Sequence, residues 1–339
     1  MGFKLLILTS GPDGEPNGAF YQEDWVEQLE NLIPDIDINL CRTTEEAISN
    51  IAHIDAAFGY LTEDMIKAAT NLKWLACPQA GPPKGFYNQT LINSSIVVTN
   101  IKGIYSDHIS THIMSYVLSF SRGLHKYVRN QLNSEWSIAV PTIHLPDSTL
   151  LIVGVGGIGK ETARLCKEFG MKVFGIDPKT TELETIIEKI YLPSHLEDIL
   201  PEADFVISTV PETPDSKKMF AFNQFKLMKH SAYFINIGRG STVSLNDLNR
   251  AISTGEIAGA ALDVFETEPL PKNHPLWTQE DVIITPHVAA EGPYLDNRRT
   301  DIFINNCIKF NKKEPLINVV DKAQSVSYTH LTLPTNREV

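Results

Sequence analysis

Cysteine is scarce in this sequence: there are four in 339 residues, and no two of them form a C-x-x-C pair. Cys41, Cys77, Cys166 and Cys307 are scattered along the chain, which indicates neither a disulfide framework nor a zinc-binding spacing. We therefore expect reduced, mostly buried thiols in a cytoplasmic protein.

Positive charge and long apolar runs are also lacking. Lys and Arg number 29 against 41 Asp and Glu, which gives a formal charge of −12 and argues against a nucleic-acid-binding surface. The longest apolar runs, such as LLILTS and TLLIVGVG, have the length of a strand, so no membrane span is expected. The apolar run in the N-terminal MGFKLLILTSGPDG is too short for a signal peptide.

Strand-like runs alternate with helical patterns along most of the chain, which is typical of βαβ units and parallel sheets. The first series of predicted strands is KLLILTS, DINLC, AAFGYL, KWLACPQ and SIVVTNI. The second series is TLLIVGVG, MKVFGID, DFVISTV, AYFINIG, AGAALDVF and DVIITPH. One long helix is predicted from about Ser106 to Gln131, and another from about Asp296 to Phe310, which is expected to return to the first domain.

The segment AQSVSYTHLTLPTNREV at the C-terminus has no period that matches the rest of the chain. It follows what reads as a natural end near Asp321 and looks like translated adapter sequence, with a genuine disordered tail as the alternative. We interpret residues 322–339 as a non-native or disordered tail.

The strand TLLIVGVG leads into a G-x-G-x-x-G pattern at Gly154, Gly156 and Gly159, and an amphipathic helix follows. In this context the first glycine permits a tight turn, the second lets backbone approach a pyrophosphate, and the third allows close packing of helix on strand. Gly157 and Ile158 lie at the helix start, where unpaired N–H groups attract anions. A glycine-rich turn without a ligand is the alternative.

The next predicted strand ends in Asp177, at the position where a carboxylate can hydrogen-bond ribose hydroxyls. A carboxylate there repels a 2′-phosphate, so NAD is favoured over NADP. Lys179, two residues later, is the one feature that favours the phosphate.

Several reactive side chains follow the predicted strands of the second series. Ligands bind outside the carboxyl ends of such strands, and these ends carry Arg239, Asp263, Glu268 and His287. Each alone has a plain alternative: a surface cation, a solvated carboxylate or a structural histidine. Together, an anion-binding arginine, a proton carrier and an orienting carboxylate form a working set. The glycines beside Arg239 suggest crowding of its backbone against a ligand.

These residues resemble those of the D-isomer-specific 2-hydroxyacid dehydrogenase family. The matching stretches are GVGGIG with Asp177, STVPETPDS, INIGRGSTVSLNDLNRAISTGEIAGAALDVFETEPLP and ITPHVAA, and the resemblance covers nearly all of residues 1 to about 320. It implies an α/β fold in which a Rossmann-type doubly wound NAD-binding domain (residues 106–289) is inserted into a smaller flavodoxin-like substrate domain (residues 1–105 and 290–321). It also implies an active site in the cleft between the domains, and a homodimer.

The resemblance assigns roles residue by residue. Arg239 would bind a small 2-keto acid, His287 would be the acid/base, and Glu268 would hold His287. Val210, Pro211 and Ile237 would line the cofactor, and Asp263 would contact the nicotinamide carboxamide. The loop PQAGPPKG would bind the substrate carboxylate through Ala80 and Gly81, and departs from the family pattern at Pro82 and Pro83, which donate no N–H.

Other interpretations remain beside this one. An NAD-sensing, corepressor-like binding protein of the same fold would keep the same reactive residues. A formate dehydrogenase is disfavoured, because that branch resembles a Gln–His pair. His108 and His112 have the spacing of a zinc pair but lack a third ligand, so a packing role is preferred and no metal is expected. His274 is expected to be structural, and Trp136 resembles a position that reaches the partner's active site in some relatives.

Overall fold

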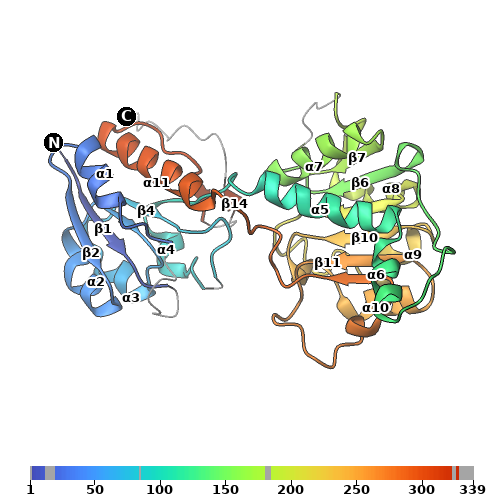
Figure 1. Ribbon diagram of the computed structural model, residues 1–339. Helices are drawn as coiled ribbons and strands as arrows, with labels where there is room; N and C mark the ends of the chain where they lie inside the picture. The colour runs from blue at the N-terminus through green and yellow to red at the C-terminus, as the bar shows by residue number, and fades with distance from the viewer. Residues whose placement is uncertain (1, 12–19, 84, 180–184, 323–325, 328–339) are drawn as a thin grey trace. The chain divides into compact units, whose positions relative to one another are not determined.

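The computed structural model describes residues 2–11, 20–83, 85–179, 185–322 and 326–327. By its contacts the chain divides into two compact units. Unit 1 comprises Met1–Ile104 and Pro293–Val339, and unit 2 comprises Tyr105–Gly292. Unit 2 is therefore inserted in the sequence of unit 1 (Figure 1).

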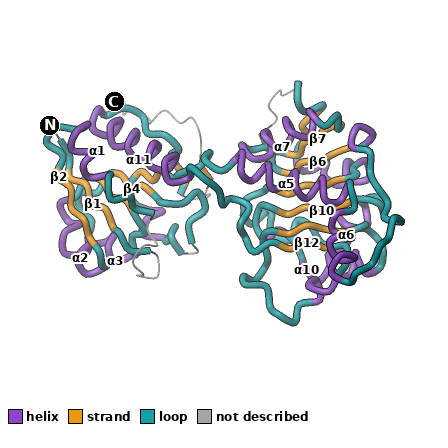
Figure 2. Tube along the Cα trace, in the orientation of Figure 1, coloured by secondary structure: helices purple, strands orange, loops and turns teal. Residues whose placement is uncertain are grey.

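Unit 1 is a five-stranded parallel sheet with helices on both faces (Figure 2). Its strands are β1 (Lys4–Leu8), β2 (Asp37–Cys41), β3 (Ala56–Phe58), β4 (Trp74–Ala76) and β5 (Val97–Thr99), in the order β2-β1-β3-β4-β5. Its helices are α1 (Trp25–Leu32), α2 (Thr44–Asn50), α3 (Glu63–Ala68), α4 (Gln89–Asn93) and α11 (Leu295–Lys312). This strand order is that of flavodoxin-like folds.

Alternation along β1 shows how the sheet is covered. Leu5 and Ile7 face a core that includes Trp25 of α1 and Phe303 of α11, whereas Leu6 and Leu8 face the core under α2, α3 and α4. Successive strand residues point to opposite faces, so a strand apolar throughout can only lie between two helical layers. Thr62 caps α3 by accepting the Met65 N–H at 3.3 Å.

Unit 2 is a seven-stranded sheet. Its strands are β6 (Thr149–Val153), β7 (Lys172–Ile176), β8 (Lys189–Tyr191), β9 (Phe205–Ser208), β10 (Tyr233–Asn236), β11 (Gly259–Leu262) and β12 (Val282–Ile284). Its α-helices are α5 (Ser106–Ser121), α6 (Leu124–Leu132), α7 (Gly157–Glu168), α8 (Leu196–Ile199), α9 (Phe222–Leu227) and α10 (Leu245–Ser253). One apolar core lies under α5 and α7, and the other under α8, α9 and α10.

The strand order in unit 2 is β12-β11-β10-β9-β6-β7-β8, and every pairing is parallel. From β6 the sheet grows through β7 on one side and through β9 on the other. Such a reversal of direction marks the place where open α/β sheets bind ligands. The predicted fold class, a Rossmann-type doubly wound unit within a smaller flavodoxin-like unit, is confirmed.

Two details differ from the sequence prediction. The long helix expected from Ser106 to Gln131 is two helices, because Gly123 has φ +67° and a Cβ there would meet Val140 Cγ1 at 2.3 Å. Strand β8 has no counterpart among the predicted strands. Within the expected tail, Val326–Ser327 form β14, which pairs antiparallel with β13 (Val320–Asp321), while residues 323–325 and 328–339 lie outside the described residues.

The four cysteines are unpaired and buried. Among the described residues, no helix combines the length and the apolar character needed to cross a membrane. In the same part of the chain, no three His, Cys, Asp or Glu side chains gather as metal ligands.

Candidate active site

The glycine loop between β6 and α7 places three glycines in three different surroundings. Gly154 has φ +98°, a conformation that favours glycine. A Cβ on Gly159 would lie 2.3 Å from the Gly154 carbonyl oxygen, whereas a Cβ on Gly156 would meet nothing within 4 Å. The loop is therefore closed by Gly159 and open beside Gly156, at the N-terminus of α7, where the first N–H groups have no helical partner. This open, anion-attracting corner fits a dinucleotide pyrophosphate.

Asp177 follows β7 and is tied to the same loop. One of its carboxylate oxygens accepts the Val155 N–H at 2.8 Å, and the other accepts the Lys179 N–H at 2.8 Å. Ionised carboxylates have about four acceptor positions, so two remain for a ligand's hydroxyl groups. Val210 and Ile237 are buried next to the ends of β9 and β10, and Pro211 is exposed.

Arg239 lies in the turn after β10 and is half-buried. Its carbonyl oxygen accepts hydrogen bonds from Asn236 Nδ2 at 3.1 Å and from Thr242 Oγ1 at 2.7 Å. Burial lowers the pKa of Arg239, while the carboxylates of Glu268 and Glu212 raise it. The guanidinium stays charged at neutral pH, since its ordinary value is so high.

The glycines beside Arg239 lie close to the protein's own backbone. A Cβ on Gly238 would lie 2.5 Å from the Val210 carbonyl oxygen, and one on Gly240 would lie 1.9 Å from backbone atoms of Phe265. The protein's own backbone is therefore sufficient to require these glycines, and crowding of the turn against a ligand stays a prediction. What the glycines do is pack the arginine turn tightly between two neighbouring loops.

Glu268 and His287 form a hydrogen-bonded pair. His287 Nδ1 lies 2.7 Å from Glu268 Oε2. The other carboxylate oxygen accepts the Phe265 N–H at 2.9 Å, which fixes the carboxylate from behind. The imidazole side chain is 48% exposed, so its Nε2 edge is accessible to a small molecule. This is the arrangement of a proton carrier held by an orienting carboxylate. His274, in contrast, accepts the Leu276 N–H in a local turn.

Asp263 follows β11 and is only 2% exposed. Its carboxylate accepts the N–H groups of Val288 and Ala289 at 2.9 and 3.0 Å, and the Thr285 hydroxyl at 2.5 Å. These partners lie on both sides of His287 in the sequence. The structure thus brings Asp263, Glu268 and His287 together in unit 2. The negative charge of Glu268 acts on the Arg239 guanidinium and raises its pKa against the effect of burial.

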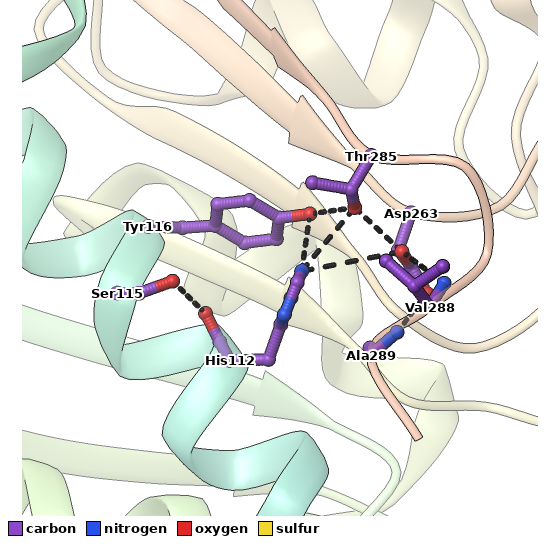
Figure 3. A network of polar contacts seen from close by, with 7 residues as sticks. All are labelled: His112, Ser115, Tyr116, Asp263, Thr285, Val288 and Ala289. Atoms are coloured by element: carbon purple, nitrogen blue, oxygen red, sulfur yellow. Dashed lines mark hydrogen bonds and ion pairs between the residues drawn. The ribbon is translucent and has the colours of Figure 1, made fainter. Parts of the chain in front are cut away.

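Three further residues extend this cluster: Thr285 and Tyr116, which no sequence motif indicated, and His112, for which a packing role was expected. Thr285, Tyr116 and His112 form a chain of polar contacts that ends on Asp263 (Figure 3). His112 therefore has its Nε2 directed at Tyr116 and Thr285. A signal was present in the spacing of His112 and Tyr116, which lie four residues apart on one face of α5, but their common partner is distant in sequence.

The expected substrate residues Ala80 and Gly81 follow β4 in unit 1. The Ala80 carbonyl oxygen accepts a hydrogen bond from Asn100 Nδ2 at 3.1 Å, which holds this segment in place. The backbone N–H groups of Ala80 and Gly81 are the donors that could bind an anion.

The sheet order, the glycine loop and the carboxylate after β7 define unit 2 as a dinucleotide-binding α/β domain of the Rossmann class. Residues 114–289 match the family model of the NAD-binding domain of D-isomer specific 2-hydroxyacid dehydrogenases. A glyoxylate reductase of Thermofilum pendens is 31% identical over 291 residues, which cover 82% of this chain and 84% of that protein.

Solved structures agree with this match. A D-isomer specific 2-hydroxyacid dehydrogenase family protein of Aeromonas salmonicida is 29% identical, with a TM-score of 0.76 over 95% of this chain and 100% of that one. A glyoxylate/hydroxypyruvate reductase of Sinorhizobium meliloti, solved with NADP and sulfate, is 24% identical with a TM-score of 0.75, over 95% and 99% of the two chains. This chain belongs to the D-isomer specific 2-hydroxyacid dehydrogenase family. It is an oxidoreductase acting on a CH–OH group, and the predicted family is confirmed.

Proposed function

We propose that the protein reduces a small 2-keto acid to its D-2-hydroxy acid, with His287 as acid/base, Glu268 as its orienting carboxylate and Arg239 as the substrate-binding cation. The observation that carries this proposal is the 2.7 Å contact between His287 and Glu268 at the edge where Arg239 also lies.

Each of these side chains has a separate task. Arg239 pairs with the negative charge of the acid and polarises its keto group. His287 donates a proton to the keto oxygen, and the adjacent Glu268 carboxylate, 2.7 Å from Nδ1, holds the ring in the orientation for that donation. A nicotinamide cofactor, when bound, supplies the hydride. The half-buried setting of Arg239 strengthens its pairing, because charges interact more strongly away from water.

We propose NAD as the preferred cofactor, held by Gly154, Gly156, Gly157, Ile158 and Gly159, with Asp177 on the ribose. The further cofactor contacts would be Val210, Pro211, Ile237 and Asp263. A free carboxylate edge on Asp177 supports this, because it would repel a 2′-phosphate. Because the Sinorhizobium enzyme was solved with NADP, the preference between NAD and NADP has to be measured directly. NADH should bind more tightly than NADPH in a fluorescence titration, and the reverse order would overturn the assignment.

For the substrate we propose glyoxylate or a similarly small 2-keto acid, with its carboxylate bound by Ala80 and Gly81. The relatives named glyoxylate reductase support this size class. The test follows NADH absorbance against a panel of 2-keto acids, with NADPH in parallel. His287→Asn is the control, since it keeps a polar side chain but cannot carry the proton.

Two outcomes would be decisive. Turnover that prefers NADH and falls by a factor on the order of 10³ in His287→Asn would agree with the proposed proton transfer. A His287→Asn variant with near wild-type turnover would refute it. Tight NADH binding without turnover on any acid would favour the NAD-sensing alternative.

We also propose a homodimer formed through α6 and the segment after it. Leu124, Val128 and Leu132 leave an apolar stripe exposed, and Trp136 and Ile138 beyond them are 97% and 88% exposed. A surface pocket of about 470 Å³ lies beside them, between α6 and Val140. Contiguous exposed apolar side chains of this kind mark a protein interface, and a second copy of this chain is the partner that the family resemblance implies.

Light scattering on a sizing column tests the assembly. The wild-type mass should be that of two chains, and Leu132→Asp with Ile138→Asp should give a folded monomer. A monomeric wild-type protein would contradict the proposal.

We also propose that the protein is cytoplasmic, because its four thiols are unpaired and buried.

A further inference from the structure

The backbone at His287 lies in a conformation that needs support. Its φ is +56°, in the left-handed region that few residues other than glycine adopt. Conformations of this kind are strained and persist only where the surroundings impose them. The position of the proton-carrying ring therefore depends on what holds this turn.

Asp263 holds the turn from both sides. Its Oδ1 accepts the Thr285 hydroxyl, two residues before His287, and the N–H of Val288, one residue after it. Its Oδ2 accepts the N–H of Ala289. A buried carboxylate with three hydrogen bonds is well compensated, and here these bonds bracket His287 on both sides.

Helix α5 provides the next two members of the chain. Tyr116 Oη lies 2.5 Å from Thr285 Oγ1, and His112 Nε2 lies 2.9 Å from Tyr116 Oη and 3.2 Å from Thr285 Oγ1. Figure 3 shows the four side chains converging from α5 and from the ends of β11 and β12. The two helix residues are one turn apart, so both reach the same point.

The direction of donation follows from the carboxylate. Asp263 can only accept, so the Thr285 hydroxyl donates to it, and Tyr116 must donate to Thr285. Burial raises the pKa of Tyr116, which keeps its proton in place. Burial also lowers the pKa of His112, although the charge of Asp263 opposes this, so the ring is neutral and its N–H faces Tyr116. Each contact between His112, Tyr116, Thr285 and Asp263 thereby has one donor and one acceptor.

We propose that Tyr116 is a positioning residue for His287, acting through Thr285 and Asp263 and held in place by His112. The proposal rests on the proposed function, in which His287 carries the proton. The Tyr116 hydroxyl fixes the rotamer of Thr285, Thr285 fixes Asp263, and Asp263 fixes the strained turn. Without that hydroxyl the turn relaxes, and the imidazole moves relative to Glu268 and to the bound keto acid.

A packing role for Tyr116 must be separated from this one, because the residue is 3% exposed. Tyr116→Phe keeps the ring and removes only the hydroxyl. Tyr233→Phe is the matched control: Tyr233 stacks on Phe120 of the same helix at 4.2 Å, and its ring belongs to the same apolar face. Both changes remove one phenol oxygen, from a buried ring at Tyr116 and from a half-buried ring at Tyr233, but only the first belongs to the chain of contacts to His287.

The kinetic experiment compares kcat and KM for NADH-dependent reduction in these variants. Tyr116→Phe should lower kcat about tenfold with both KM values within about twofold, since a misplaced reacting group costs rate rather than binding. Thr285→Val should give the same loss of kcat, whereas Thr285→Ser, which keeps the hydroxyl, should retain wild-type kcat. The double variant Tyr116→Phe/Thr285→Val should be no slower than either single variant. Tyr233→Phe should keep the wild-type kcat. Equal kcat values for Tyr116→Phe and Tyr233→Phe would overturn the proposal.

A second measurement is independent of turnover. Amide hydrogen exchange in a peptide covering residues 285–290 should become faster in Tyr116→Phe and stay unchanged in Tyr233→Phe, because the Val288 and Ala289 N–H groups lose a fixed acceptor. Unchanged protection in both variants would refute the positioning role. If His287→Asn is fully active while protection is lost in Tyr116→Phe, the proposed function fails, whereas the support that Tyr116 gives to the turn at His287 stands.

Discussion

At the scale of single residues, His287 combines an exposed ring with a constrained backbone. Arg239, Glu268 and His287 could be recognised in the sequence because each follows a predicted strand, and strand ends meet at one edge of a parallel sheet. Thr285, Tyr116 and His112 could not. Their contact depends on how α5 packs on the sheet, which no local pattern encodes.

The charge of Glu268, rather than its shape, is expected to matter. Glu268→Gln keeps a hydrogen-bonding group beside His287 but removes the negative charge that pairs with the ring, so the reductive kcat should fall by a factor on the order of 10². The side chain is 37% exposed, and the thermal midpoint should therefore change little. Steady-state kinetics and a melting curve check both expectations, with Glu280→Gln, an exposed carboxylate, as the control. A variant that retains full activity would show that the pair has no role in proton transfer.

Asp281 offers a test of electrostatics away from the site. His125 and Lys126, 3.4 and 2.9 Å away, hold the pKa of Asp281 below its ordinary value. A depressed carboxyl pKa stabilises the fold above the unfolded value of about 4, and this contribution disappears as pH falls through the folded value. Asp281→Asn should cost about 1 kcal/mol at pH 7.

Denaturant unfolding across pH measures this cost. The difference between wild type and Asp281→Asn should shrink as pH falls below about 4. A difference that stays constant with pH would mean that the loss reflects packing alone.

At the scale of helices, strands and loops, the glycine loop was predicted from the sequence, whereas the break between α5 and α6 was not. The loop was predictable, because G-x-G-x-x-G after a strand has a known geometry. The break between α5 and α6 was not predicted, because the apolar period continues through Gly123 and only its contact with Val140 shows that the chain must turn. Strand β8 was missed because its three residues, Lys189–Tyr191, are exposed or half-buried and offer no apolar run.

Two glycines of the loop should respond differently to a methyl group. Gly159→Ala places a Cβ 2.3 Å from the Gly154 carbonyl, so it should lower the thermal midpoint by several degrees and weaken NADH binding. Gly156→Ala meets no protein atom within 4 Å, so it should leave the midpoint unchanged and weaken NADH binding alone. Calorimetry and a binding titration distinguish the two. Unaltered NADH affinity in Gly156→Ala would contradict the proposed approach of the pyrophosphate.

At the scale of the whole molecule, the chain enters unit 1, forms unit 2, and returns to unit 1 with α11. Phe303 of that helix packs against Trp25 and Phe58 with ring centroids 4.5 and 4.8 Å apart. The alternation of strands and helices predicted the two sheets. It could not predict these aromatic contacts, whose partners are separated by most of the sequence.

Two fragments test this organisation. Unit 2 contains a complete sheet and two apolar cores of its own, so residues 105–292 should fold alone with a cooperative thermal transition and bind NADH. Residues 1–104 lack α11 and should remain unfolded or aggregate, whereas adding residues 293–321 through a linker should restore folding. Circular dichroism with a binding titration is sufficient. A cooperative transition in residues 1–104 alone would show that α11 is dispensable.

The split of unit 1 also has a consequence for synthesis on the ribosome. Residues 105–292 must all be translated before α11 emerges, which takes roughly ten seconds or more at cellular elongation rates. During that time the sheet face of Phe58 and Trp74 is covered by α1 but not yet by Phe303, Ile304 and Cys307 of α11. The nascent protein therefore carries a half-covered aromatic surface while unit 2 is translated, and chaperone demand should fall once Leu295–Lys312 have emerged.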